Sequence, residues 1–97
     1  MSVFINAKDL KEQASIVDLL ANLGFKPARK TGKEYLYISM LREGDTNPSL
    51  SVDDALGVWF DHGTRKGGNI IDFGLAYWKY LTFNEVVEKL QEHCAVQ

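Results

Sequence analysis

The chain has 97 residues, of which 45% are apolar and 11% aromatic, enough for the core of a single domain over residues 1–97 and too many for a disordered chain. Its net charge of −2 does not mark it as a nucleic-acid binder. The single cysteine excludes an intramolecular disulfide, and no apolar run approaches the ~20 residues that cross a bilayer. We therefore expect a cytoplasmic protein with no membrane association.

The N-terminal quarter of the chain predicts helix. Apolar residues recur at helical spacing across residues 6–24, and Gly24 provides a stop signal. Ser15 followed by Asp18 resembles a capping box, in which a hydroxyl accepts a backbone N–H at the start of a helix. The pattern thus indicates a helix that is interrupted near Ser15.

The middle of the chain predicts an antiparallel meander. Residues 26–34 (KPARKTGKE) are a polar connector with a turn at Thr31 and Gly32. Alternating apolar and polar residues then predict three strands, at 34–40, 49–53 and 57–61, joined by loops and turns.

Two capping signals predict the C-terminal helices. Asn69 with Asp72 can begin one helix, and Thr82 with Glu85 can begin the last, which has a clear apolar stripe. The fold class predicted is therefore α+β: a small three-stranded antiparallel sheet flanked by N- and C-terminal helices.

The residues that usually carry metal or nucleophilic chemistry are too few here. A structural zinc site needs four nitrogen or sulfur ligands, and only His62, His93 and Cys94 are available. Cys94 is best interpreted as a small core residue. No nucleophile elbow or other complete catalytic constellation is present, so we expect a non-catalytic module.

The segment from Arg65 to Asn69 could contact an anion. It combines two cations, Arg65 and Lys66, with two glycines, Gly67 and Gly68, directly before a predicted helix start. Helix N-termini bind phosphate readily, although the ending of a P-loop is missing. Phosphate contact and an ordinary glycine turn with solvated charges are both open at this point.

Aromatic residues suggest a second mode of binding. Tyr35, Tyr37 and Trp59 can share one face of the sheet, and cations near its edges would give a stacking platform for single-stranded nucleic acid. The alternative is that these rings belong to the core, which a chain this short favours.

Three stretches carry a family resemblance by their order and spacing: residues 48–52 (PSLSV), 68–73 (GNIIDF) and 81–90 (LTFNEVVEKL). With LLANLGF before them and GVWFDHGTRKG between them, they resemble the zinc-ribbon domain of bacterial-type DNA primases over roughly residues 15–92. That resemblance implies the small zinc-ribbon-like fold predicted above.

The family's zinc ligands are missing from this chain. Asp61 and Thr64 stand at the Cys-x-x-Cys positions. The Cys-x-x-His positions hold either Ser39 and Arg42 or, one residue along, Met40 and Glu43. We therefore expect no zinc and no other cofactor. Asp61 could accept N–H groups across the loop and pair with Arg42, in an ion pair worth about 0–1 kcal/mol if exposed.

The resemblance implies a DNA-binding module, for single-stranded template, in a primase-like or mobilisation protein such as those of Bacteroides mobile elements. In the family, polymerisation belongs to a separate TOPRIM domain, so this chain could be the N-terminal part of a longer protein or act beside a primase or helicase partner. The alternative is a protein-interaction module that has lost DNA binding. The candidate contacts to nucleic acid are Lys30, Lys33, Tyr35, Arg42, Trp59, Arg65, Lys66, Gly67, Gly68 and Asn69.

Overall fold

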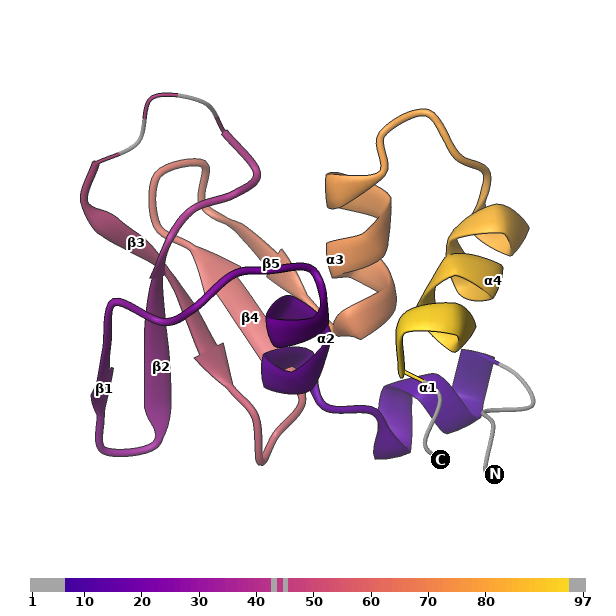
Figure 1. The fold of residues 1–97 in the computed structure, drawn as a ribbon, viewed down its shortest axis with the longest axis horizontal. Helices are drawn as coiled ribbons and strands as arrows, with labels where there is room; N and C mark the ends of the chain where they lie inside the picture. The colour runs from indigo at the N-terminus through magenta and orange to yellow at the C-terminus, as the bar shows by residue number, and fades with distance from the viewer. Residues whose placement is uncertain (1–6, 43, 45, 95–97) are drawn as a thin grey trace.

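The structure is a computed structural model that describes residues 7–42, 44 and 46–94. Its N-terminal part consists of two short helices, α1 (Ala7–Gln13) and α2 (Ile16–Asn22) (Figure 1). The predicted interruption at Ser15 is confirmed, since its hydroxyl oxygen accepts the backbone N–H of Asp18 at 3.0 Å as the N-cap of α2.

The start of α2 is also tied to the sheet. The Ser15 hydroxyl donates to Oδ2 of Asp54 at 2.7 Å, and the backbone N–H of Val17 donates to Oδ1 at 3.2 Å. Asp54 lies in the turn between the third and fourth strands, so this carboxylate fixes the helix against the sheet and complements the helix dipole.

The sheet has five strands, in the order β1-β2-β3-β4-β5, and every neighbouring pair is antiparallel. They are β1 (Arg29–Thr31), β2 (Glu34–Ile38), β3 (Pro48–Asp53), β4 (Val58–Asp61) and β5 (Lys66–Gly68). The prediction of three strands was therefore wrong.

Both additional strands are short and lack an alternating apolar pattern. Gly32 adopts a positive φ of 55°, which allows the predicted polar connector to fold into a hairpin and pair with β2 as β1. The predicted glycine turn pairs with β4 as β5. Their polar, glycine-rich sequences gave no strand signal because pairing, and not side-chain burial, holds them in place.

Two helices complete the fold, α3 (Ile70–Tyr77) and α4 (Phe83–Cys94), and both predicted capping boxes are present. Gly74 of α3 allows a close approach to α4, because a Cβ at that position would meet Cγ1 of Val86 at 2.6 Å. No helix within the described part of the chain is long and apolar enough to span a membrane.

The strand register gives the sheet two different faces. Tyr37 lies opposite Leu50, and Leu50 in turn lies opposite Asp61; on the same face, Val52 lies opposite Trp59. All five of these side chains are buried. This face forms one core with the buried helix residues Leu10, Ile16, Leu19, Leu20, Ile70, Ile71, Phe73, Val86 and Leu90.

The opposite face of the sheet carries residues of the other parity. One row across the strands contains Arg29, Leu36, Ser51, Phe60 and Gly67. We call this row and its neighbours of the same parity, Val58 and His62, the open face, since Phe60 and Val58 are 38% and 40% exposed.

Candidate functional site

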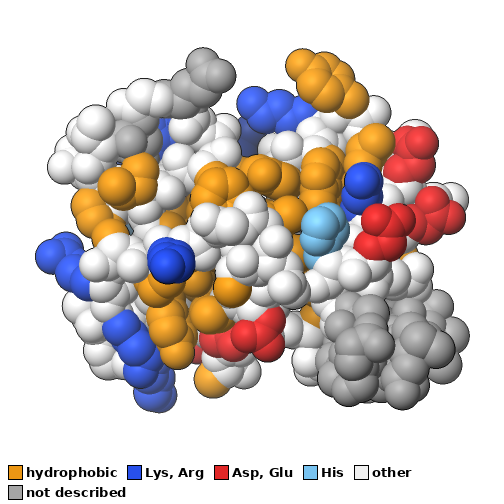
Figure 2. Space-filling model, in the orientation of Figure 1, with side chains coloured by type: hydrophobic (Ala, Val, Ile, Leu, Met, Phe, Trp, Pro, Cys, Tyr) orange, Lys and Arg blue, Asp and Glu red, His pale blue; other side chains and the backbone are white. Residues whose placement is uncertain are grey.

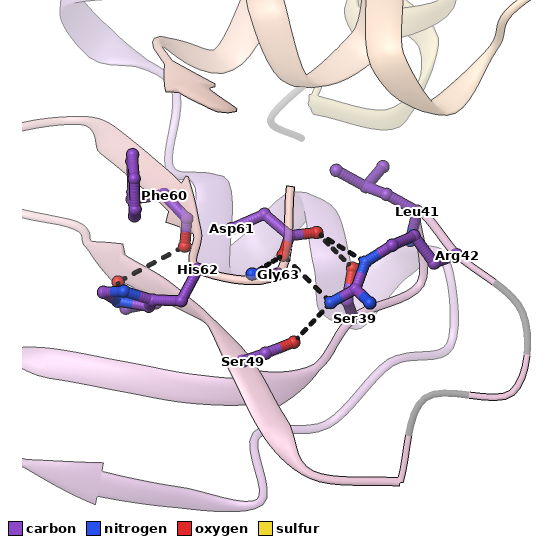
Figure 3. A network of polar contacts seen from close by, with 9 residues as sticks. Ser39, Leu41, Arg42, Ser49, Phe60, Asp61, His62 and Gly63 are labelled. Carbon is purple, nitrogen blue, oxygen red and sulfur yellow. Dashed lines mark hydrogen bonds and ion pairs between the residues drawn. The ribbon is translucent and has the colours of Figure 1, made fainter. Parts of the chain in front are cut away.

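A polar cluster closes one end of the buried face. It is formed by residues 39–42, after β2, and 61–65, at the end of β4, which we call the knuckle (Figure 3). At its centre the fully buried carboxylate of Asp61 accepts hydrogen bonds from the Ser39 hydroxyl at 2.8 Å and from the backbone N–H of Gly63 at 2.8 Å.

Arg42 completes this cluster with a two-point contact. Its Nη2 donates to Oδ1 of Asp61 at 3.1 Å and its Nε to Oδ2 at 3.4 Å, while Nη2 also reaches the Ser49 hydroxyl at 2.8 Å. Gly63 has no side chain where the guanidinium lies, and a Cβ there would overlap it. The knuckle is therefore shaped around Arg42 as well as around Asp61.

The electrostatics of Asp61 follow from these contacts. Burial alone would raise the pKa of Asp61, but the hydrogen bonds from Ser39, Arg42 and Gly63, together with the charge of Arg42, hold the pKa below its ordinary value. The carboxylate is thus charged at neutral pH and is neutralised in place.

The predicted pairing of Asp61 with Arg42 is confirmed, and Ser39 donates a hydrogen bond to the same carboxylate. Glu43 lies outside the described residues, and Thr64 is exposed beside Arg42. The value of about 0–1 kcal/mol was conditional on exposure, and that condition is not met, since the Asp61 side chain is 0% exposed and that of Arg42 is 32% exposed. Breaking such a pair costs more than breaking a surface one.

The residues at the family's ligand positions are poor ligands for a zinc ion. Of Ser39, Arg42, Asp61 and Thr64, only Asp61 is a type that zinc uses, and its oxygens already accept hydrogen bonds from three residues. No group of three or more His, Cys, Asp or Glu residues that could hold a metal occurs in the described part of the chain.

The only cysteine offers no nucleophile. Cys94 is partly buried at the end of α4 and packs against the core, as the sequence predicts. Burial, with a smaller effect of the Asp18 carboxylate, raises the pKa of its thiol to about 11, so the thiol is protonated at neutral pH.

The predicted nucleic-acid contacts do not form one site. Lys30, Lys33 and Tyr35 belong to the β1–β2 hairpin, whereas Arg65 and Lys66 belong to the β4–β5 hairpin. These hairpins form opposite edges of the sheet, roughly 19 Å apart for five strands at the usual spacing.

The proposed aromatic platform is corrected by the strand register. Trp59 is only 4% exposed, its indole N–H donates to the backbone oxygen of Asn69 at 2.8 Å, and its ring packs edge-on against Phe73. Tyr37 is likewise buried, so the core alternative holds for both. Tyr35 is half-buried, with Nζ of Lys30 5.3 Å from its ring centroid.

The helix start after the glycines is already occupied. The Asn69 side chain accepts the N–H groups of Ile71 and Asp72, and Asp72 accepts the N–H of Asn69. A Cβ at Gly67 would overlap β4, and one at Gly68 would overlap Asp72. The glycines thus serve packing and capping, which favours the glycine-turn interpretation over the phosphate one.

The open face carries candidate contacts that the sequence analysis missed. The rings of Phe60 and His62 meet edge-on with centroids 4.9 Å apart, His62 Nε2 lies 3.5 Å from the Ser51 hydroxyl, and Arg29 lies in the row that contains Phe60. Parity could have found them, since residues 58, 60 and 62 must face away from Trp59 and Asp61.

Charge is unevenly distributed over the surface. In Figure 2, basic side chains lie mainly over the sheet on the left and in a group at the top, while many acidic ones gather over the helices on the right. The net charge of −2 therefore conceals a basic side of the molecule.

The chain belongs to the CHC2 zinc finger family, because the model of that family, the DnaG zinc ribbon, matches residues 4–97. Over 83 residues it is 31% identical to the DNA primases of Listeria monocytogenes and Listeria innocua, which covers 86% of this chain and 13% of each relative. The fold resembles the crystal structure of the zinc-binding and RNA polymerase domains of Aquifex aeolicus primase, with a TM-score of 0.73 and 24% identity over 100% of this chain and 23% of that one. The predicted family resemblance is confirmed.

Proposed function

We propose that this chain is a module of a primase-like protein that binds single-stranded DNA through the open face of its sheet. The observation that carries the proposal is the exposed Phe60–His62 pair on a sheet face that also carries Arg29 three strands away, in a family whose relatives are DNA primases. Exposed rings stack on bases of any sequence, and the flanking cations contact phosphates.

Fluorescence anisotropy with a labelled single-stranded oligonucleotide tests this function at low and moderate salt. Phe60→Ala should weaken binding about tenfold, since a stacked base contributes ~1–3 kcal/mol. Phe83→Ala is a matched control, because Phe83 is also an exposed ring, 51% exposed, but lies on α4. Equal binding by all three proteins, or no salt-sensitive binding by the unaltered chain, would exclude the proposal.

The second part of the proposal is that the knuckle needs no zinc. The guanidinium of Arg42 lies against Gly63 and pairs with the carboxylate of Asp61, so the one zinc-type group at these positions already has a cationic partner. Elemental analysis should find no stoichiometric zinc, and a strong chelator should leave the midpoint of thermal unfolding unchanged. Stoichiometric zinc that resists dialysis would overturn this part.

Polymerisation is not assigned to this chain. It spans 13% of the length of the primases that it resembles, and the described residues contain no group of three or more His, Cys, Asp or Glu residues that could hold a metal ion. We infer that the module acts with a TOPRIM-type catalytic domain or a helicase, either on the same polypeptide or as a separate partner.

One observation favours protein interaction as a second function. Tyr80, which is 98% exposed, borders a hollow of about 310 Å³ together with Trp78 and Leu81, on the side of the molecule away from the open face. A pull-down with a neighbouring replication protein, repeated after nuclease treatment, separates the two functions. Capture that survives the nuclease supports protein interaction.

A further inference from the structure

A groove lies between the knuckle and the C-terminal half of α3. It consists of two adjoining hollows, of about 560 and 390 Å³, that share Leu41, Arg42, Ala76 and Lys79. Each hollow has the size of a small-molecule site. We call the two together the α3 groove; it lies on the helix side of the sheet, at the top of Figure 1.

The groove is basic. Lys66 lines it from the edge strand β5, Lys79 from the loop after α3, and Arg42 from the knuckle, while none of the described residues that line either hollow is an aspartate or glutamate. Arg42 is balanced by Asp61, so the uncompensated charge comes from the two lysines. Both are exposed, and within residues 7–42, 44 and 46–94 the structure shows no carboxylate paired with either.

Cations that line one hollow repel each other, and the attraction of an anion bound among them offsets that repulsion. Here the two lysines come from different segments, Lys66 from β5 and Lys79 from the loop after α3, and the exposed Thr64 lines the same hollow as Arg42. The lining is mixed, because it also includes the apolar residues Leu41 and Ala76 and the aromatic residue Tyr77. A phosphate with an attached organic group suits this combination better than a bare inorganic ion does.

We propose that the α3 groove binds phosphate groups of a nucleotide, with Lys66 and Lys79 as its principal contacts. The phosphates could belong to a single strand or to a free nucleoside triphosphate. The first source rests on the function proposed above: β5 is the edge strand, and its exposed Gly67 lies in the same row as Phe60, so a strand stacked on the open face can pass over that edge to Lys66.

Amide chemical shifts of the ¹⁵N-labelled chain test the inference directly. Titration with a thymidine oligonucleotide, with ATP and with inorganic phosphate should shift the amides of Leu41, Ala76 and Lys79 with at least one of the first two. Shifts with the oligonucleotide alone identify a strand as the source, and shifts with ATP alone identify a free nucleotide. Unchanged amides at those three positions in all titrations would overturn the inference.

Lysine substitutions supply the energetic test. Lys66→Gln and Lys79→Gln should each weaken oligonucleotide binding about five- to tenfold at low salt and reduce the salt slope by about 0.7. Lys8→Gln is the matched control, since Lys8 is an exposed lysine of α1, at the other end of the molecule. If Phe60→Ala weakens binding but both groove variants bind as tightly as the control, the proposed function stands and the groove has no role in it. If no oligonucleotide binds, the ATP titration alone decides whether the α3 groove binds nucleotide phosphates.

Discussion

The buried face of the sheet contains two regions that are held together differently. In its middle, Tyr37, Leu50, Val52 and Trp59 pack against the helices as apolar surface. At the knuckle end, two residues beyond Trp59 in β4, Asp61 is equally buried but is held by directed hydrogen bonds and a charge. The stabilisation from apolar burial has no preferred direction and does not change with pH. The stabilisation at the knuckle requires particular donor and acceptor atoms and an ionised carboxylate.

The largest expected effect is on the apolar region. Leu50→Ala should lower the free energy of unfolding by about 3 kcal/mol, because Leu50 is fully buried and truncation leaves a cavity. Urea unfolding followed by circular dichroism measures this loss. The loss should be the same at pH 7 and at pH 4, and a strong pH dependence would contradict the comparison.

Removing the carboxylate at the centre of the knuckle should lower the free energy of unfolding slightly less than Leu50→Ala does. Asp61→Ala leaves Ser39, Arg42 and the N–H of Gly63 without their acceptor, at a cost of about 2–3 kcal/mol. The cost lies below that of a fully buried pair because Arg42, which is 32% exposed, can turn toward water. Glu88→Gln, an exposed acid on α4, is the control and should change stability by less than about 0.5 kcal/mol.

Acid should weaken the knuckle selectively. Because the folded-state pKa of Asp61 is lowered, its carboxylate stabilises the fold above the unfolded pKa of about 3.9, and this contribution fades as the pH falls from there toward the folded value. The difference in unfolding free energy between the unaltered chain and Asp61→Asn should therefore be constant at neutral pH and shrink below about pH 4. A difference that grows on acidification would show that folding raises the pKa of Asp61 and does not lower it.

The smallest expected effect is a gain in stability, from removing the hydroxyl of Tyr37. The hydroxyl of Tyr37 is buried and has no hydrogen-bond partner among the described residues, and burial, followed by the charge of Asp54, raises its pKa to about 12. Tyr37→Phe removes this polar group from the apolar region and should stabilise the chain by up to about 1 kcal/mol. Tyr35→Phe serves as a comparison in thermal unfolding, and a clear loss in Tyr37→Phe would reveal a partner for the hydroxyl.

Much of the fold follows from local sequence. The start of each of α2, α3 and α4 is marked by a capping side chain, of Ser15, Asn69 and Thr82 respectively. Each of these side chains accepts a backbone N–H within three residues, so the signal can be read from local sequence without knowledge of the tertiary structure. The alternation in β2, β3 and β4 likewise reflects neighbouring side chains. The resemblance to the family came from three sequence stretches, residues 48–52, 68–73 and 81–90, through their order and spacing.

The site depended on contacts that local sequence does not encode. Which of Trp59 and Phe60 faces the helices is decided by register with the neighbouring strand, and a shift of one residue would reverse it. β1 and β5 exist only because β2 and β4 offer them hydrogen bonds. The meeting of Ser39, Arg42 and Asp61 joins segments about twenty residues apart, and Lys79 reaches the groove only because α3 packs beside the knuckle. Sequence thus determined the elements through short-range bonds, while tertiary packing decided which side chains were left facing a ligand.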